Sequence, residues 1–336
     1  MLMGSRLRNS RRALIALGLL VVSISFITTS ARAQAKIELR LGHGVAVDTP
    51  VDRGVKRLAE LVNERSGGTI VVRTYAMSLG NESQLIEGLQ TGAVDMAANV
   101  APSFGTVLPL SNVLGILYLF RDVDHMQKVM RGDVGRRISS ALLEKLKIHV
   151  IDQSWYFGTR QLTSNRPVTK PEDLQGMKVR VLPIPIYMSG WRTLGATPTP
   201  IPFPDLFTAI QNNLVDAQEN PLSNIKGAGF QLLHKHLTLT SHIISSWVIS
   251  MSDNAYRRLT PEQHKIIAQA VKDAGAYQDK LELESEVAIL KEWQQGGVMT
   301  VHTVDKGAFK AKVAKLPAEF QGGILNEMYG LIQAVK

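Results

Sequence analysis

Apolar residues alternate with polar ones, or recur at helical spacing, along most of the chain after residue 36. The stretch 37–41 alternates strictly and predicts a first strand, and Thr49 followed by Pro50 is typical of a helix start. This helix is expected to end near Arg65. Further along, the pattern predicts a strand at 69–75, a helix at 82–91, a strand at 94–98, a helix at 134–146, strands from His149 and at 177–182 and 241–252, a long helix from Thr260, a strand at 298–301 and a helical C-terminal stretch. Alternating strands and helices indicate an α/β fold with a largely parallel sheet.

The helix that Thr260 opens is the longest expected element. About 35 residues would span about 50 Å, which is enough to reach across two lobes. Gly275 lies within its apolar stripe and is a candidate kink. A chain of 336 residues also exceeds what one hydrophobic core usually serves, so two lobes are expected.

An internal similarity supports two lobes of similar construction. Residues 85–99 align without gaps onto residues 206–220, and five of the fifteen positions are identical, including Asn99 and Asn220 at the end. Each copy follows a predicted strand. Two similar lobes with a cleft between them would form a binding architecture.

The first 35 residues differ from the rest. Basic residues precede an apolar run over 13–27, and A-x-A sites follow that run directly, as in a secretory signal peptide. A membrane anchor is the alternative, but it would need about 20 apolar residues. The predicted organisation is a signal peptide at 1–35, lobe I at 36–157 plus 246–285, and lobe II at 158–245 plus 286–336.

Composition narrows the possible functions. The formal charge is +9, but five arginines lie in the predicted signal, and the remainder has 33 basic and 29 acidic residues, a net charge of +4. This charge is too small to indicate a nucleic-acid partner. The chain has no cysteine, and we find no nucleophile elbow, zinc-protease motif, P-loop or dinucleotide fingerprint. No cofactor and no metal site are predicted.

Two arginines near strand ends are candidate ligand contacts. Arg180 lies near the end of the strand 177–182, and Arg160 follows three aromatic residues and a glycine. Ligands bind outside the carboxyl ends of strands in α/β sheets, and arginine binds carboxylates bidentately. By sequence alone, however, Arg180 fits a solvated strand face slightly better.

Four other candidate ligand residues can each be interpreted in two ways. Asn220 precedes Pro221, so its amide is expected in a loop, either as a ligand contact or as an ordinary turn residue. Phe203 and Tyr156 suit a cleft wall or a plain core. His43 ends the first strand in a glycine turn, where it either contacts a ligand or is merely exposed.

The motifs together resemble the solute receptors of tripartite ATP-independent periplasmic (TRAP) transporters. The similar segments are P-E-D-L-Q-G-M-K-V-R-V, G-A-T-P-T-P-I-P-F-P-D-L-F-T-A-I-Q, V-D-A-Q-E-N-P, G-H-G-V-A-V-D-T-P and G-T-R-Q-L-T-S-N-R-P-V. The resemblance implies two α/β lobes with crossing connections and a long helix that spans both. It also implies that Arg180 binds a ligand carboxylate, with Arg160, Asn220 and Phe203 as further contacts.

The functional prediction is therefore a periplasmic receptor for a small organic acid that passes its ligand to sodium-coupled TRAP membrane subunits. The predicted ligand is either a sugar acid or a C4-dicarboxylate. Glu82, Asn99, His43 and Tyr156 complete the predicted ligand-binding set. We expect a monomer that is not an enzyme and does not insert stably into the membrane after processing. The alternatives are a receptor for a sensor kinase, and an isomerase or lyase with Glu219 or His43 as its base.

Overall fold

The structure is a computed structural model that describes residues 36–336. The predicted signal peptide at 1–35 lies outside the described residues. Over 36–336, no helix is both long enough and apolar enough to cross a membrane.

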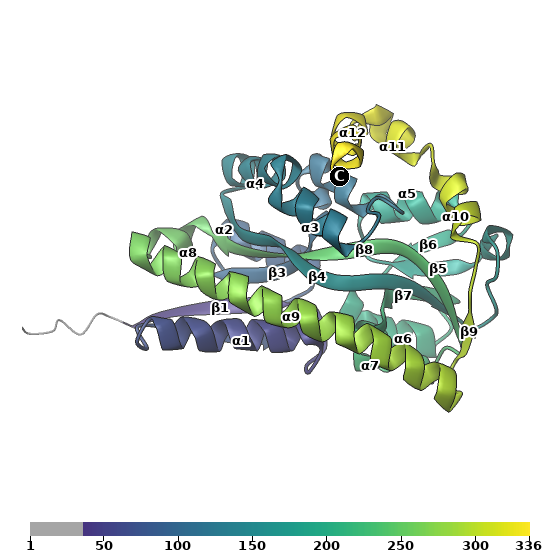
Figure 1. The fold of residues 1–336 in the computed structure, drawn as a ribbon, viewed down its shortest axis with the longest axis horizontal. Coiled ribbons are helices and arrows are strands. Elements are labelled where there is room, and N and C mark those ends of the chain that lie inside the picture. The colour runs from purple at the N-terminus through teal and green to yellow at the C-terminus, as the bar shows by residue number, and fades with distance from the viewer. Residues whose placement is uncertain (1–35) are drawn as a thin grey trace, which may run out of the picture. The chain divides into compact units, whose positions relative to one another are not determined.

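Nine strands form one mixed sheet in the order β2-β1-β3-β8-β4-β7-β5-β6, with β9 beside β8 (Figure 1). Their bounds are β1 Ile37–His43, β2 Ile70–Ala76, β3 Met96–Val100, β4 Ile148–Ser164, β5 Lys178–Val181, β6 Thr197–Pro200, β7 Ala217–Pro221, β8 His236–Ser252 and β9 Thr300–His302.

The prediction of a largely parallel sheet is right at the two ends and wrong in the middle. Strands β2, β1 and β3 are parallel, as are β6, β5 and β7. The long strands β4 and β8 run antiparallel to each other and to their neighbours β7 and β3. These two strands join the parallel halves of the sheet. The sequence did not predict their direction, because an apolar pattern does not reveal which way a strand runs.

The helices pack around this sheet. They are α1 Pro50–Arg65, α2 Glu82–Thr91, α3 Val123–Arg131, α4 Asp133–Leu146, α5 Pro185–Thr193, α6 Leu206–Gln211, α7 Leu222–Gly227, α8 Asp253–Arg257, α9 Pro261–Gly296, α10 Lys306–Val313, α11 Leu316–Glu319 and α12 Asn326–Ala334. Helices α1, α2 and α4 lie within one residue of the predicted bounds, whereas α3, α5, α7 and α8 were not predicted. The side chains of Thr49 and Thr260 cap α1 and α9 by accepting hydrogen bonds from Asp52 N and Gln263 N.

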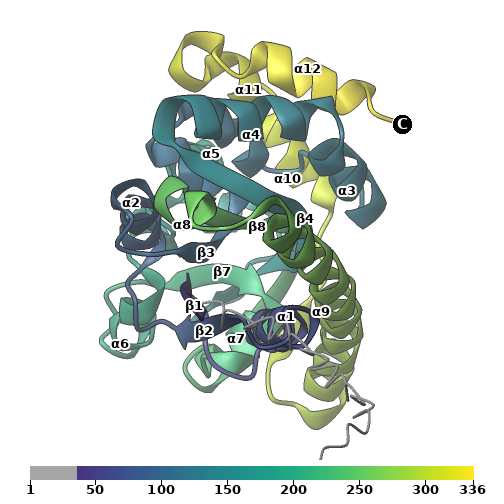
Figure 2. The same cartoon turned by 90° about the vertical axis from the view of Figure 1, so that its left-hand side faces the viewer.

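Helix α9 is the long helix that the sequence predicted, and it has 36 residues. It packs against α1 near one end and against α7 and β9 near the other, with β4 between (Figures 1 and 2). The helix is assigned without a break through Gly275, where the sequence offered a candidate kink. Gly275 is instead a close-packing position, because a Cβ there would lie 2.4 Å from the indole nitrogen of Trp155.

Several strand boundaries differ from the predictions by two or more residues. Strand β3 begins at Met96, two residues later than expected, and β8 begins at His236, five residues earlier. Asn220 lies within β7 instead of in a loop. In each case backbone pairing with a distant strand sets the boundary, and local composition does not contain that information.

Candidate functional site

Arg160 lies on β4, just after an irregularity in that strand. Pairing with β8 shifts register between Tyr156 and Gly158, and Gly158 has a φ of 118°, which only glycine adopts readily. The first half of β4 pairs only with β8, whereas residues from Arg160 onward also pair with β7. The bulge therefore lies where the chain passes from one half of the sheet to the other.

The guanidinium of Arg160 is fully buried and paired. Its Nε and Nη2 donate to the two carboxylate oxygens of Glu219, the Nη2–Oε1 distance being 2.8 Å. Nη2 also donates to the Glu219 carbonyl at 2.7 Å and to Oδ1 of Asn220 at 3.2 Å. Its Nη1 has no hydrogen-bond partner in residues 36–336. Arg160 is thus anchored on β7, and its Nη1 is left to donate to another group.

Glu219 is a buried carboxylate held between Arg160 and His242. His242 on β8 places its Nε2 3.0 Å from Oε2 of Glu219. Burial opposes ionisation of Glu219, but the charge of Arg160 and the contact with His242 outweigh burial and lower its pKa to about 2. A carboxyl group with such a low pKa accepts protons poorly near neutral pH, which counts against the predicted alternative of an enzyme that uses Glu219.

Arg180 is also fully buried, so the expectation of a solvated strand face is wrong. Its Nε donates to the carbonyl of Ile201 at 2.7 Å, and its guanidinium carbon lies 5.9 Å from the centre of the Phe203 ring. Both Nη1 and Nη2 are buried without a hydrogen-bond partner among the described residues. Burial, together with the nearby positive charge of Arg160, lowers the pKa of Arg180 to about 9 even though Glu219 opposes this shift.

Asn220 contacts Arg160 through its Oδ1, and Gln218 holds the other end of its amide. Its Nδ2 donates to Oε1 of Gln218 at 2.6 Å, and the Gln218 amide in turn donates to Oγ1 of Thr163 at 2.7 Å. This chain of hydrogen bonds fixes which end of the Asn220 amide faces Arg160.

Glu82 and Asn99 come together from the other half of the sheet. Asn99 on β3 donates from Nδ2 to Oε2 of Glu82 at 3.0 Å, and Val100 N donates to the same oxygen at 3.1 Å. Burial raises the pKa of Glu82, partly offset by these hydrogen bonds and by the positive charge of Arg160. The positive charge of Arg160 therefore acts on Glu82 from the other half of the structure.

A narrow pocket of only about 10 Å³ separates two walls that come from different halves of the chain. One wall contains Gly44 and Glu82, and the other contains Leu182 and Phe203, with Asn81 and three prolines at the rim. The pocket is narrow, so the two walls are close to contact in this structure.

Two predicted residues have other partners. His43 is buried, with its Nε2 3.3 Å from Oδ1 of Asp52. The Tyr156 hydroxyl contacts Oγ1 of Thr159 and Oε2 of Glu286 on α9, each at 2.7 Å. These contacts tie His43 to α1 and Tyr156 to α9.

Sequence reasoning missed His242 and Tyr187. The Arg160 guanidinium carbon lies 5.7 Å from the Tyr187 ring centre, and Trp191 packs edge-on against His242 at 5.0 Å. Tyr187 and Trp191 are one helical turn apart in α5, which is a detectable signal for a buried face. The pairing of His242 with Glu219 has no local signal.

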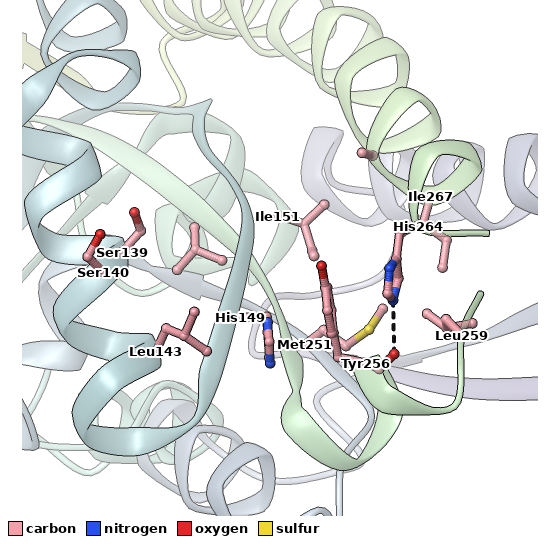
Figure 3. Close-up of a pocket in the computed structure, with 12 residues that line it drawn as sticks. Ser139, Ser140, Leu143, His149, Ile151, Met251, Tyr256, Leu259, His264 and Ile267 are labelled. Atoms are coloured by element: carbon pink, nitrogen blue, oxygen red, sulfur yellow. Dashed lines mark hydrogen bonds between the residues drawn. The ribbon is translucent and has the colours of Figure 1, made fainter. Parts of the chain in front are cut away.

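A second pocket lies away from these residues (Figure 3). Its walls include His149 and His264, which stack on either side of Tyr256 with ring centres 3.8 and 3.9 Å away. None of the predicted ligand residues lines it. Within 36–336, no group of three or more histidine, aspartate or glutamate side chains could hold a metal ion.

Comparison with known proteins identifies the family. Residues 41–322 match the family model of the bacterial extracellular solute-binding proteins, family 7. A solute-binding protein from Roseobacter denitrificans is 32% identical, over 87% of this chain and 89% of that protein.

Solved structures agree with this match. The Roseobacter denitrificans protein was solved with bound L-galactonate and superposes with a TM-score of 0.83, 30% identity and coverage of 90% of this chain and 99% of that one. A TRAP receptor from Polaromonas with D-erythronate gives a TM-score of 0.85, 29% identity and coverage of 90% and 99%. One from Sulfurospirillum deleyianum with succinate gives 0.84, 27% identity and coverage of 90% and 100%. The chain therefore belongs to family 7 of the bacterial extracellular solute-binding proteins, with the two-lobed fold of TRAP solute receptors.

Proposed function

We propose that this protein is a periplasmic receptor for a sugar acid with one carboxylate, which binds between the two lobes. The observation that carries the proposal is the Arg180 guanidinium, whose two Nη groups are buried and have no partner in the described part of the chain. A buried, unpaired charge is costly, and a ligand carboxylate would satisfy both Nη groups bidentately. The free Nη1 of Arg160 and the amide of Asn220 would contact the same ligand.

The balance of charge favours one carboxylate over two. Arg160 and Glu219 neutralise each other, which leaves the charge of Arg180 for the ligand. A second carboxylate would meet Glu82 on the opposite wall, where two like charges repel at low dielectric. Hydroxyl groups would instead donate to Glu82. The relatives solved with galactonate and erythronate support a sugar acid, and the one with succinate keeps a dicarboxylate as the competing ligand.

Delivery to TRAP membrane subunits follows from the family, and we propose it for this chain together with export by the segment 1–35. The lobes proposed are 36–157 plus 246–285 and 158–245 plus 286–336. They would close around the ligand by a hinge motion of the crossing strands. We propose a monomeric receptor without catalytic activity, whose ligand leaves unchanged.

Calorimetric titration of purified protein with galactonate, gluconate, erythronate and succinate tests the ligand class. We expect the sugar acids to bind and succinate to bind at least tenfold more weakly, a difference of about 1.4 kcal/mol. Arg180→Ala should weaken sugar-acid binding at least a hundredfold, whereas Arg192→Ala, on the exposed side of α5, should not change it. Unchanged affinity in Arg180→Ala would contradict the proposal, and tighter binding of succinate would replace the sugar acid with a dicarboxylate.

A further inference from the structure

Helix α9 contacts the backbone of β4 at the bulge through a row of acidic and amide side chains. Oδ1 of Asp279 accepts from Tyr156 N, and Oε1 of Glu286 accepts from Thr159 N, both at 2.6 Å. Nε2 of Gln278 donates to the Tyr156 carbonyl at 2.8 Å. The bulge disrupts the regular ladder of β4, and α9 supplies partners for its backbone groups.

Glu282 stands in the middle of this row and is completely buried. Its Oε1 accepts from Oγ of Ser223 on α7 at 2.7 Å, and a Cβ on Gly158 would lie 2.8 Å from the same oxygen. Glu282 on α9 thus lies next to Gly158 at the bulge, and Gly158 precedes Arg160 by two residues on β4. Its other oxygen, Oε2, is buried without a hydrogen-bond partner in residues 36–336.

The charges around Glu282 do not stabilise a carboxylate. On its own helix, Asp279 and Glu286 raise its pKa further beyond the effect of burial. On α7, Lys226 is paired with Glu292, and on α1, Lys56 is paired with Asp52. On β4, the hydroxyl of Tyr156 is bonded to Glu286. No basic side chain forms an ion pair with Glu282 in the described part of the chain.

A second unpartnered atom lies one helical turn away. Oε1 of Gln278 is buried without a partner, and the orientation of this amide is fixed because Nε2 must donate to the Tyr156 carbonyl. Residues at i and i+4 of a helix are neighbours on one face. Both oxygens are buried acceptors without a donor, and one proton shared between the two side chains would satisfy both.

We propose that Glu282 carries a proton in the folded protein and donates it from Oε2 to Oε1 of Gln278, forming a latch between α9, β4 and α7. The protonated side chain keeps Gln278 on the Tyr156 carbonyl and accepts from Ser223 at the same time. Ionisation would leave a bare charge between Asp279 and Glu286 and break the link to Gln278. The segment that positions Arg160 would then loosen as the pH rises.

The sign of the pH dependence follows from the proton count. The pKa of Glu282 is raised well above its ordinary value of 4.5, so the folded state holds a proton that the unfolded chain releases. Stability from this group is fully present below the ordinary pKa and falls as pH rises towards the folded pKa. Glu282→Gln resembles the protonated acid in shape and can donate to Gln278, so it avoids this loss.

Thermal unfolding between about pH 5 and about pH 9 tests the latch without any ligand. The midpoint of the wild type should fall by about 2 °C per pH unit relative to Glu282→Gln. Glu284→Gln, an exposed neighbour on the same helix, should follow the wild type. Identical pH profiles for the wild type and Glu282→Gln would overturn the proposal.

A spectroscopic measurement on the wild type keeps the proposal testable if Glu282→Gln does not fold. In protein with ¹³C-labelled glutamate carboxyl groups, one buried glutamate should remain protonated at neutral pH, and its signal should be absent from Glu282→Gln where that variant folds. A full set of glutamates that all titrate with ordinary pKa values would overturn the proposal.

Discussion

Glu219 binds Arg160 through two parallel hydrogen bonds, and both side chains are completely buried. The pair joins β7 to β4 and orients the guanidinium so that Nη1 stays free. A buried pair of this kind contributes little net stability compared with an apolar pair, but removal of one partner leaves the other charge uncompensated. Four predictions follow from this arrangement and from its surroundings.

Glu219→Gln should destabilise the protein by about 3 to 5 kcal/mol near neutral pH, because Arg160 loses its counter-charge in a buried position. The free energy of unfolding from urea denaturation measures the effect. Glu292→Gln removes the exposed partner of Lys226 and is the matched control, with an expected change below about 1 kcal/mol. Equal effects of the two substitutions would contradict the importance assigned to the buried pair.

The cost of Glu219→Gln should shrink in acid. The pKa of Glu219 is lowered in the folded state, so its contribution to stability is present above the ordinary pKa of 4.5 and is lost as the pH falls towards about 2. Unfolding free energies of the wild type and the variant should therefore converge as the pH falls through this range. A constant difference between them would mean that Glu219 is not held ionised by Arg160.

Glu82→Gln should relax the preference between ligand classes. Loss of the negative charge removes repulsion of a second ligand carboxylate, so affinity for succinate should rise about tenfold while affinity for sugar acids falls. The ratio of the two calorimetric affinities is the measurement. Glu87→Gln, on the exposed side of the same helix, should leave the ratio unchanged. If Glu82→Gln left this ratio unchanged, residues other than Glu82 would determine the preference between sugar acids and succinate.

Gly158→Ala should destabilise the protein by several kcal/mol, roughly 3 or more, because it combines an unfavourable φ with a steric clash. A Cβ at this position would lie 2.6 Å from Cβ of Pro221 and 2.8 Å from Oε1 of Glu282. Gly176→Ala is the control, since Gly176 has a φ of 71° and no atom within 4 Å of its Cβ position. The control should cost about 1 kcal/mol, and equal costs would show that strain alone is responsible.

The sequence by itself determined the elements whose signals are local. The start of α1 at Pro50 and the whole of α9 followed from capping residues, proline at the first helical position and apolar spacing. The similar segments 85–99 and 206–220 each form a helix followed by a strand, although the strand at the end of the second segment was expected to be a loop. The motifs around Arg180 were also sufficient to indicate the family.

Only the tertiary structure decided how these elements meet. The antiparallel crossing of β4 and β8, the burial of Arg180, the pairing of Arg160 with Glu219 and His242, and the orphaned oxygens of Gln278 and Glu282 all depend on residues far apart in the chain. Burial and charge pairing are properties of three-dimensional neighbours, whereas caps and periodicity are properties of adjacent residues. For the same reason the contact of Tyr156 with Glu286 on α9 could not be read from the ordinary aromatic pattern of the sequence around it.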